Sequence, residues 1–157
     1  MDAPQQIRPK RLNDYLEVMS KAVFQTGISW RVIESKWPGF KEAFFDFDPE
    51  RIARLSPKEI DVLAADTRIV RNRRKIEATV ANAATMVELN ARFGSFRKYL
   101  RSHDGFAETT ADLKKRFNFI GDVGAYYFLH VVGEDVPPHE EVMAQTSVRT
   151  RPRRGPK

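Results

Sequence analysis

Apolar residues recur at every third or fourth position along most of this chain, and no other sequence feature constrains its fold as strongly. The first example, Leu12, Tyr15, Leu16 and Met19, predicts an amphipathic helix that ends at a turn around Gly27. No window of the sequence alternates convincingly between apolar and polar residues, which is the pattern of a half-buried strand. The spacing therefore predicts an all-α fold.

Local signals predict where several helices begin and end. A second helix should stop before Pro38, because proline and glycine commonly end helices. Asp48 followed by Pro49, and the Ser-Pro-Lys-Glu capping box at residues 56–59, each mark a helix start. Further helices are expected around residues 76–87, near residues 96–100 and over residues 125–132.

Length and composition limit the class of protein. With 157 residues, 41% of them hydrophobic, the chain suits one globular domain, expected over residues 1–142, followed by a basic, disordered tail at 143–157. The absence of cysteine excludes disulfides, thiolate metal sites and a cysteine nucleophile, and it fits a reducing compartment. No apolar run is long enough to span a bilayer or to form a signal peptide. We therefore expect a cytoplasmic monomer that binds no membrane, metal or cofactor.

The formal charge of +6 suggests an anionic partner, but the charge is unevenly distributed. Five of the 27 basic residues, and none of the 21 acidic ones, follow Met143, so the rest of the chain is nearly neutral. The tail either contacts phosphates without sequence preference or serves only as a solvated end.

Residues 24–30 read Phe-Gln-Thr-Gly-Ile-Ser-Trp and predict a tight polar turn with an apolar residue at its tip. Gly27 permits the bend, and Ile28 follows it. Proteins that distort a DNA duplex insert apolar side chains between base steps, and enzymes that act on a base must extrude it from the stack. The alternative is that Ile28 and Trp30 begin the next helix and are buried in the core.

Two further segments have features that suit phosphate binding. Residues 67–75 carry five cationic side chains and no acid at the expected start of a helix, where the helix dipole disfavours cations unless an anion compensates. Pairing with Asp61 and Asp66, or a solvated basic face, is the alternative. Residues 117–124, Phe-Asn-Phe-Ile-Gly-Asp-Val-Gly, predict a turn whose backbone N–H groups can bind a phosphate oxygen, although glycines are common between any two helices.

In this order, four segments are similar to the DNA-3-methyladenine glycosylase I family, a branch of the helix-hairpin-helix DNA glycosylases. They are residues 25–30, 47–49, 69–76 and 119–121, and the similarity runs from Tyr15 to His139. The resemblance implies a single all-α domain with the helix-hairpin-helix glycosylase fold. It also implies hydrolysis of the N-glycosidic bond of an alkylated base, such as 3-methyladenine, in double-stranded DNA after base flipping.

The resemblance implies roles for individual residues as well. Gly27 and Ile28 would form the wedge that fills the vacated stack, and the base pocket would be lined by Ala22, Gln25 and Trp30. The DNA backbone would be contacted by Arg71, Asn72, Arg73 and Lys75 in the basic segment, and by Phe119, Gly121 and Gly124 in the hairpin.

The sequence departs from the family pattern at its pocket and its metal site. Ala22 stands where the family carries a glutamate. The family's zinc site, built from Cys and His, cannot form either, because the chain has no cysteine and only His139 lies near one of the site's positions. Glu140 or Glu141 would then supply a relocated catalytic carboxylate, unless both belong to a solvated helix start. Glu17 is a weaker candidate that is expected to face solvent.

The sequence therefore predicts a DNA base-excision repair glycosylase. A pocket with changed base specificity and a non-catalytic protein that binds DNA or lesions remain as alternatives. A helical protein–protein adaptor would explain none of the turn, the basic segment and the hairpin.

Overall fold

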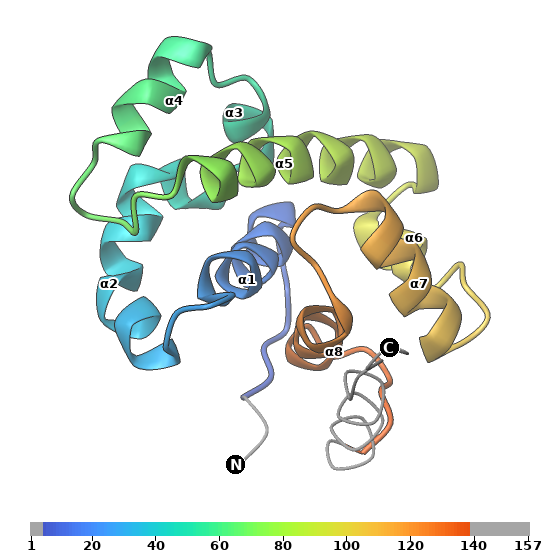
Figure 1. Ribbon diagram of the computed structural model, residues 1–157. Helices are drawn as coiled ribbons and strands as arrows, with labels where there is room; N and C mark the ends of the chain where they lie inside the picture. Colours follow the sequence, from blue (N-terminus) through green and yellow to red (C-terminus); the bar gives the residue numbers. More distant parts are fainter. Residues whose placement is uncertain (1–4, 139–157) are drawn as a thin grey trace, which may run out of the picture.

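The computed structural model describes residues 5–138, and every regular element in that range is helical (Figure 1). The predicted all-α fold is confirmed. Glu140, Glu141 and the basic tail lie outside the described residues. In chain order the elements are α1 (Leu12–Gln25), α2 (Trp30–Ala43), the 3₁₀ turn η1 (Phe45–Phe47), α3 (Pro49–Ala53), α4 (Pro57–Ala64), α5 (Arg73–Phe93), α6 (Phe96–Leu100), α7 (Phe106–Arg116) and α8 (Asp122–Val131).

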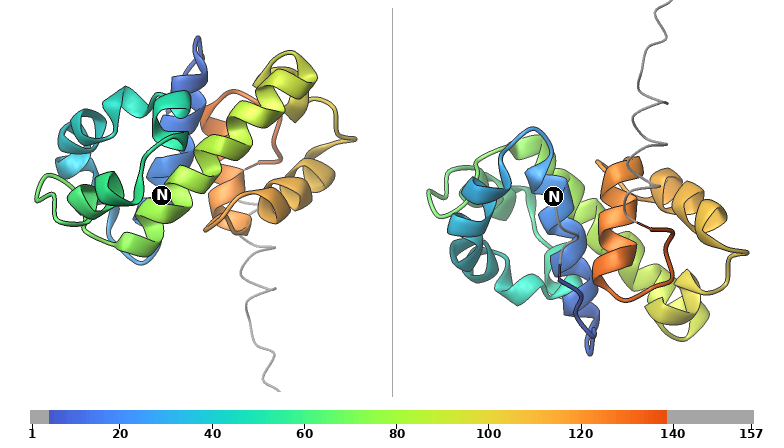
Figure 2. Two further views of the ribbon diagram at one scale, coloured as in Figure 1. Left: turned by 90° about the horizontal axis from the view of Figure 1, so that it is seen from above. Right: turned by 90° about the horizontal axis from the view of Figure 1, so that it is seen from below.

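Two helices connect the rest of the molecule. The 21-residue helix α5 crosses over α1, with α2, α3 and α4 gathered on one side of this pair and α6, α7 and α8 on the other (Figures 1 and 2). The apolar stripe of α1 is fully buried at Leu16, Met19 and Val23, as its spacing predicted. Side chains of α1 therefore reach both groups of helices.

Most predicted helix starts are confirmed. The Asp48 carboxylate accepts hydrogen bonds from the backbone N–H groups of Glu50 and Arg51 at the start of α3. Ser56 and Glu59 form the predicted reciprocal capping box at the start of α4. These local interactions were readable from the sequence because each involves residues three positions apart or fewer.

One predicted helix end is wrong, because α2 continues past Pro38 to Ala43. Trp37 and Phe40 on its inner face are buried and stacked at 4.8 Å, and this packing outweighs the backbone hydrogen bond that the exposed Pro38 cannot make. Gly39 marks a close approach instead of a helix end. A Cβ atom at this position would lie only 2.7 Å from the carbonyl oxygen of Arg68.

Helix α7 has no counterpart among the predicted helices. Its sequence is mostly polar, so its apolar spacing is weak, although Lys114, Lys115 and Arg116 in the last turn suit a helix C-terminus. The Asp112 carboxylate holds α7 against α6, since it accepts a 2.6 Å hydrogen bond from the Tyr99 hydroxyl. Such a contact between two helices leaves no periodic signal in the sequence.

Replacing Gly39 with Ala tests the close approach between α2 and the segment at Arg68. Ala normally stabilises a helix interior by about 1 kcal/mol relative to Gly. Here the added methyl group must displace the Arg68 backbone, so we expect G39A to lower the free energy of unfolding by about 1–3 kcal/mol in urea denaturation.

Gly124 in α8 is the matched control, because a Cβ there would lie 3.9 Å from its nearest neighbours, an ordinary contact distance. We expect G124A to raise the free energy of unfolding by about 0.4–1 kcal/mol. An equal gain in stability from G39A would contradict the close approach.

Candidate functional site

The turn at residues 25–29, here called the glycine turn, joins α1 to α2 as the sequence predicted. The Ile28 N–H donates to the Gln25 carbonyl at 2.8 Å, and Gly27 has a φ of +79° that favours glycine. Ser29 begins the next helix, since its hydroxyl accepts a hydrogen bond from the Val32 N–H at 3.2 Å. Gly27 is exposed, with open space around its Cα.

Ile28 is intermediate between the two predictions for it, an exposed apolar tip and a buried core residue. Its side chain is half-buried and packs against the core, so it is not a freely projecting tip. The structure does not test its role as a wedge, which stays a prediction.

Lys75 occupies a different place from the one expected of a phosphate contact. Its side chain is buried, and its ammonium group donates hydrogen bonds to the carbonyl oxygens of Phe24, at 3.0 Å, and Thr26. These carbonyls belong to the C-terminal end of α1, which attracts cations because its last carbonyls lack helical partners. Burial lowers the pKa of Lys75. Lys75 therefore attaches the glycine turn to the start of α5 and is not exposed to a ligand.

The other cations of the basic segment differ in their pairing. Arg73 forms ion pairs with Asp61 and, at 3.4 Å, with Glu77, so for Arg73 the pairing alternative is correct. Asn72 caps α5 by accepting a hydrogen bond from the Lys75 N–H at 3.2 Å. Arg68 likewise pairs with Asp66 at 2.7 Å. Among the cations of residues 67–75, Arg71 and Arg74 are exposed and have no acidic partner within residues 5–138.

The predicted hairpin segment, residues 117–124, packs its first part against the middle of α5 and continues into α8. The Asn82 side chain donates to the Asn118 carbonyl at 3.2 Å and accepts from the Asn118 N–H at 2.8 Å. Phe119 adopts a φ of +63° and is 40% exposed, and Gly121 is exposed directly before α8. Gly124 instead faces inward, where an added Cβ would lie 3.9 Å from the Cβ of Ala22.

The glycine turn and the hairpin meet the same face of α5. Lys75 and Asn82 are seven residues apart, so they lie two helical turns apart on one side of the helix. Next to them, a groove of about 570 Å³ separates α5 from the hairpin. Its lining residues are Arg74, Glu77, Ala78, Ala81, Asn118 and Phe119.

The predicted pocket residues are near one another but not equally accessible. Ala22 is only 4% exposed, whereas Gln25 and Trp30 are half-buried. The Trp30 ring lies against Tyr127 of α8, with centroids 5.0 Å apart and planes at 40°. Sequence reasoning missed Tyr127. Its only signal is an aromatic ring with a polar end in a largely apolar helix, which it shares with Tyr126.

The carboxylates near this pair of rings are engaged. Glu17, expected to face solvent, is half-buried and accepts a 2.8 Å hydrogen bond from the Trp37 indole N–H. Glu34 pairs with Lys21 at 3.1 Å. Glu140 and Glu141 lie outside the described residues, so their proposed catalytic role stays a prediction.

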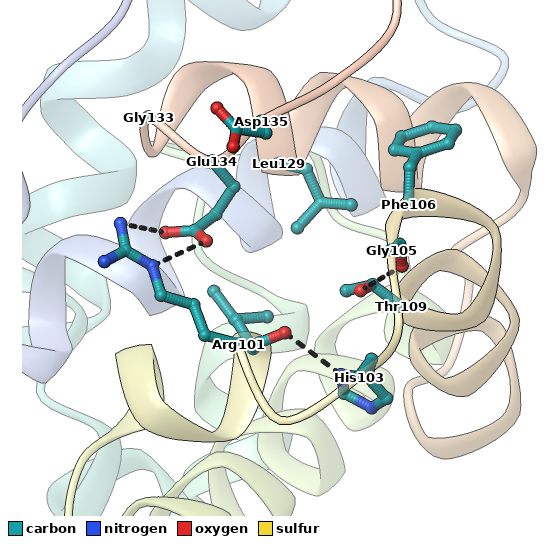
Figure 3. A pocket seen from close by; sticks show the side chains of 10 residues that line it. Arg101, His103, Gly105, Phe106, Thr109, Leu129, Gly133, Glu134 and Asp135 are labelled. Carbon is teal, nitrogen blue, oxygen red and sulfur yellow. Dashed lines mark hydrogen bonds and ion pairs between the residues drawn. The ribbon is translucent and has the colours of Figure 1, made fainter.

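A second cavity, of about 460 Å³, opens far from the glycine turn, between the α6–α7 connection and the end of α8 (Figure 3). Arg101 and Glu134 form an ion pair at 3.1 Å on its wall, and His103 lies at another side (Figure 3). Of the predicted site residues within residues 5–138, none lines this cavity.

The two ends of the described chain are joined by hydrogen bonds. The Ile7 N–H donates to the Val131 carbonyl at 2.7 Å, and the Gln6 side chain donates to the His130 carbonyl at 3.0 Å.

Within residues 5–138, no three His, Asp or Glu side chains cluster in a way that could hold a metal ion. None of the helices in this range combines the length and apolar character needed to cross a bilayer.

Replacing Lys75 with Met tests its attachment of the glycine turn. Met keeps the helix propensity and most of the side-chain volume but leaves the Phe24 and Thr26 carbonyls without their donor. We expect K75M to lower the free energy of unfolding by about 1–3 kcal/mol and to speed amide hydrogen exchange in residues 26–29. R74M is the matched control and should unfold like the wild type. Identical exchange in K75M and the wild type would contradict this role.

Known proteins of one family are similar to this chain in sequence. Residues 9–114 match the family model described as methyladenine glycosylase. DNA-3-methyladenine glycosylase of Haemophilus influenzae is 28% identical over 130 residues, and DNA-3-methyladenine glycosylase 1 of Escherichia coli is 26% identical over the same length. Each alignment covers 69% of this chain and 70% of the relative.

Solved structures show the same likeness. The 3-methyladenine DNA glycosylase I of Staphylococcus aureus superposes with a TM-score of 0.71 at 26% identity, covering 82% of this chain and 80% of that one. A variant of 3-methyladenine DNA glycosylase I in complex with 3-methyladenine gives the same TM-score and identity and covers 82% of this chain and 81% of that one. The family model matches more than half of this chain, and the chain therefore belongs to the methyladenine glycosylase family.

Proposed function

We propose that this protein is a DNA base-excision repair glycosylase that hydrolyses the N-glycosidic bond of an alkylated base, such as 3-methyladenine, after flipping it out of double-stranded DNA. One observation carries the proposal. The glycine turn and the hairpin, which the family resemblance assigns to the duplex, are both attached to one face of α5, through Lys75 and Asn82.

This arrangement suits the backbone of a DNA strand. The hairpin leads into the N-terminus of α8, where no side chain caps the first backbone N–H groups and the helix dipole favours an anion. Arg71 and Arg74 add exposed positive charge at the start of α5. Arg74 also lines the groove between α5 and the hairpin. Arg73 contributes less, because Asp61 and Glu77 already compensate its charge.

The chemistry asked of the site is modest. A methylated purine that carries a positive charge is already a good leaving group, so extrusion, stacking and stabilisation of the sugar cation are the main tasks. Trp30 beside the glycine turn offers the aromatic face for stacking. A carboxylate at Glu140 or Glu141 would stabilise the sugar cation or position water.

A second function has a specific observation in its favour. Ala22 replaces the family's pocket glutamate, and Glu17 and Glu34 are tied to Trp37 and Lys21. These features suit a protein that binds lesions without excising them. Every DNA contact proposed above would serve such a protein equally well.

Release of free base from methylated duplex DNA separates the two functions. We expect the wild type to release 3-methyladenine in buffer that contains a metal chelator, and we expect E140Q or E141Q to abolish release while keeping duplex affinity. Release by both variants would leave a glycosylase whose carboxylate lies elsewhere. No release by the wild type, together with tight binding to the same duplex, would favour the non-catalytic function.

The salt dependence of duplex binding tests the cationic surface. Each lost phosphate contact reduces the magnitude of the slope of log K against log salt by about 0.9. We expect R71Q and R74Q each to weaken binding and to reduce the slope by about this amount, measured by fluorescence anisotropy. R73Q should change the slope less, because its guanidinium is paired in the free protein. Equal slopes for the wild type, R71Q and R74Q would contradict this surface.

A further inference from the structure

Trp30 and Tyr127 form a two-ring aromatic surface whose polar ends are unused. The rings are in contact at 5.0 Å, yet neither the Trp30 indole N–H nor the Tyr127 hydroxyl has a hydrogen-bond partner within residues 5–138. Two comparable groups in the same range do have partners: the Trp37 indole N–H donates to Glu17, and the Tyr99 hydroxyl donates to Asp112. The polar ends of Trp37 and Tyr99 are thus satisfied within the protein, whereas those of Trp30 and Tyr127 are not.

Neither polar end is fully enclosed by the protein. In the described part of the chain, the fully enclosed side-chain polar atoms without a partner are the hydroxyls of Ser20 and Thr110. The Trp30 and Tyr127 groups are not among them, so solvent reaches each of them. A buried ring with an accessible donor suits a planar ligand with acceptor atoms on its edge.

The position of the pair connects it to the surface proposed to bind DNA. Trp30 lies three residues beyond Gly27 of the glycine turn, and Tyr127 lies three residues beyond Gly124 at the start of α8. Ala22 of α1 lies beside Gly124, 3.9 Å from where a Cβ of that residue would be. A base extruded at the glycine turn would therefore meet these rings first.

The surroundings of Tyr127 keep its hydroxyl a donor. Burial, together with the negative charges of Glu34 and Glu17, raises the pKa of Tyr127 well above its ordinary value. Both carboxylates are already engaged by Lys21 and Trp37. With Ala22 in place of a carboxylate, the Tyr127 hydroxyl and the Trp30 indole N–H are the unpaired donors of this pair, and a purine that stacks on the Trp30 ring leaves its edge to the Tyr127 hydroxyl.

We propose that Tyr127 is a specificity-determining residue, whose hydroxyl donates a hydrogen bond to a ring acceptor atom of the extruded purine while that purine stacks on Trp30. This inference rests on the proposed function, because it assigns the ligand to a flipped base. Recognition by a neutral donor does not require a positive charge on the base. The ligand class is thus a purine with an unsubstituted acceptor nitrogen facing Tyr127, whether the purine is cationic or neutral.

Free bases test the inference without requiring excision. We would titrate adenine and its 1-deaza, 3-deaza and 7-deaza analogues into the full-length wild type, Y127F and the control Y126F. The readout is the indole N–H signal of Trp30 in a nitrogen–proton correlation spectrum, assigned by its loss in W30F. Each deaza analogue lacks one ring acceptor, so the set reports which atom, if any, receives the hydrogen bond.

We expect one deaza analogue to bind the wild type about tenfold more weakly than adenine, the effect of about one lost hydrogen bond. Y127F should bind all four bases with equal affinity, and Y126F should keep the wild-type discrimination. Y126F is a matched control because Tyr126 is next in sequence but stacks on His130. Equal discrimination by the wild type and Y127F would overturn the proposal, as would an unmoved Trp30 signal with every base.

Binding of the methylated duplex, measured in parallel, separates this inference from the proposed function. Discrimination among free bases without duplex binding would support base recognition by Tyr127 and contradict the proposed function of the protein on DNA. Duplex binding and base release that are unchanged in Y127F, with no discrimination among free bases, would support the glycosylase function and overturn the role of Tyr127.

Discussion

The ammonium group of Lys75 is the interaction on which the site depends. It is buried under the C-terminal end of α1 and donates to carbonyls that the helix leaves without partners. A buried charge is tolerated only when it is well hydrogen-bonded, so the glycine turn cannot move away from α5 without exposing both carbonyls and leaving the ammonium unpaired. Seven residues further along α5, Asn82 holds the hairpin by two neutral hydrogen bonds. One helix thereby fixes the spacing between two segments that are about 90 residues apart in the chain.

Local signals in the sequence were sufficient for the helical class, for most helix starts and for the family. Asp48 and Ser56 cap helices through groups three residues away or fewer, and the apolar stripe of α1 repeats every three or four residues. The glycine turn was equally readable, because a positive φ at Gly27 and a capping Ser29 are consequences of residue type. Features of this kind need no knowledge of the tertiary structure.

The features that the sequence did not predict depend on how the helices pack against one another. Pro38 and Gly39 have the composition of a helix end, but the stacking of Trp37 on Phe40 carries α2 through them, and Gly39 makes room for Arg68. Lys75 is indistinguishable by sequence from its exposed neighbours Arg71 and Arg74, because only the packing of α5 on α1 buries it. Tyr127 was missed for the same reason, since its contact with Trp30 joins helices from opposite ends of the chain.

Ala22 limits the charge that the junction of α1 and α8 can carry. A carboxylate at the closely packed junction of α1 and α8 would have to be solvated or paired, and the small apolar side chain there allows Gly124 to approach without that cost. Of the acids that remain nearby, Glu34 is paired with Lys21 at 3.1 Å, and Glu17 accepts a hydrogen bond from Trp37 and lies 3.9 Å from Lys41. What this surface retains is a pair of aromatic faces with neutral donors, beside a turn and a hairpin in fixed positions. If the proposed function holds, such a surface would select by shape and by the pattern of acceptors on a base, and the charge of the lesion would matter mainly for how readily the glycosidic bond breaks.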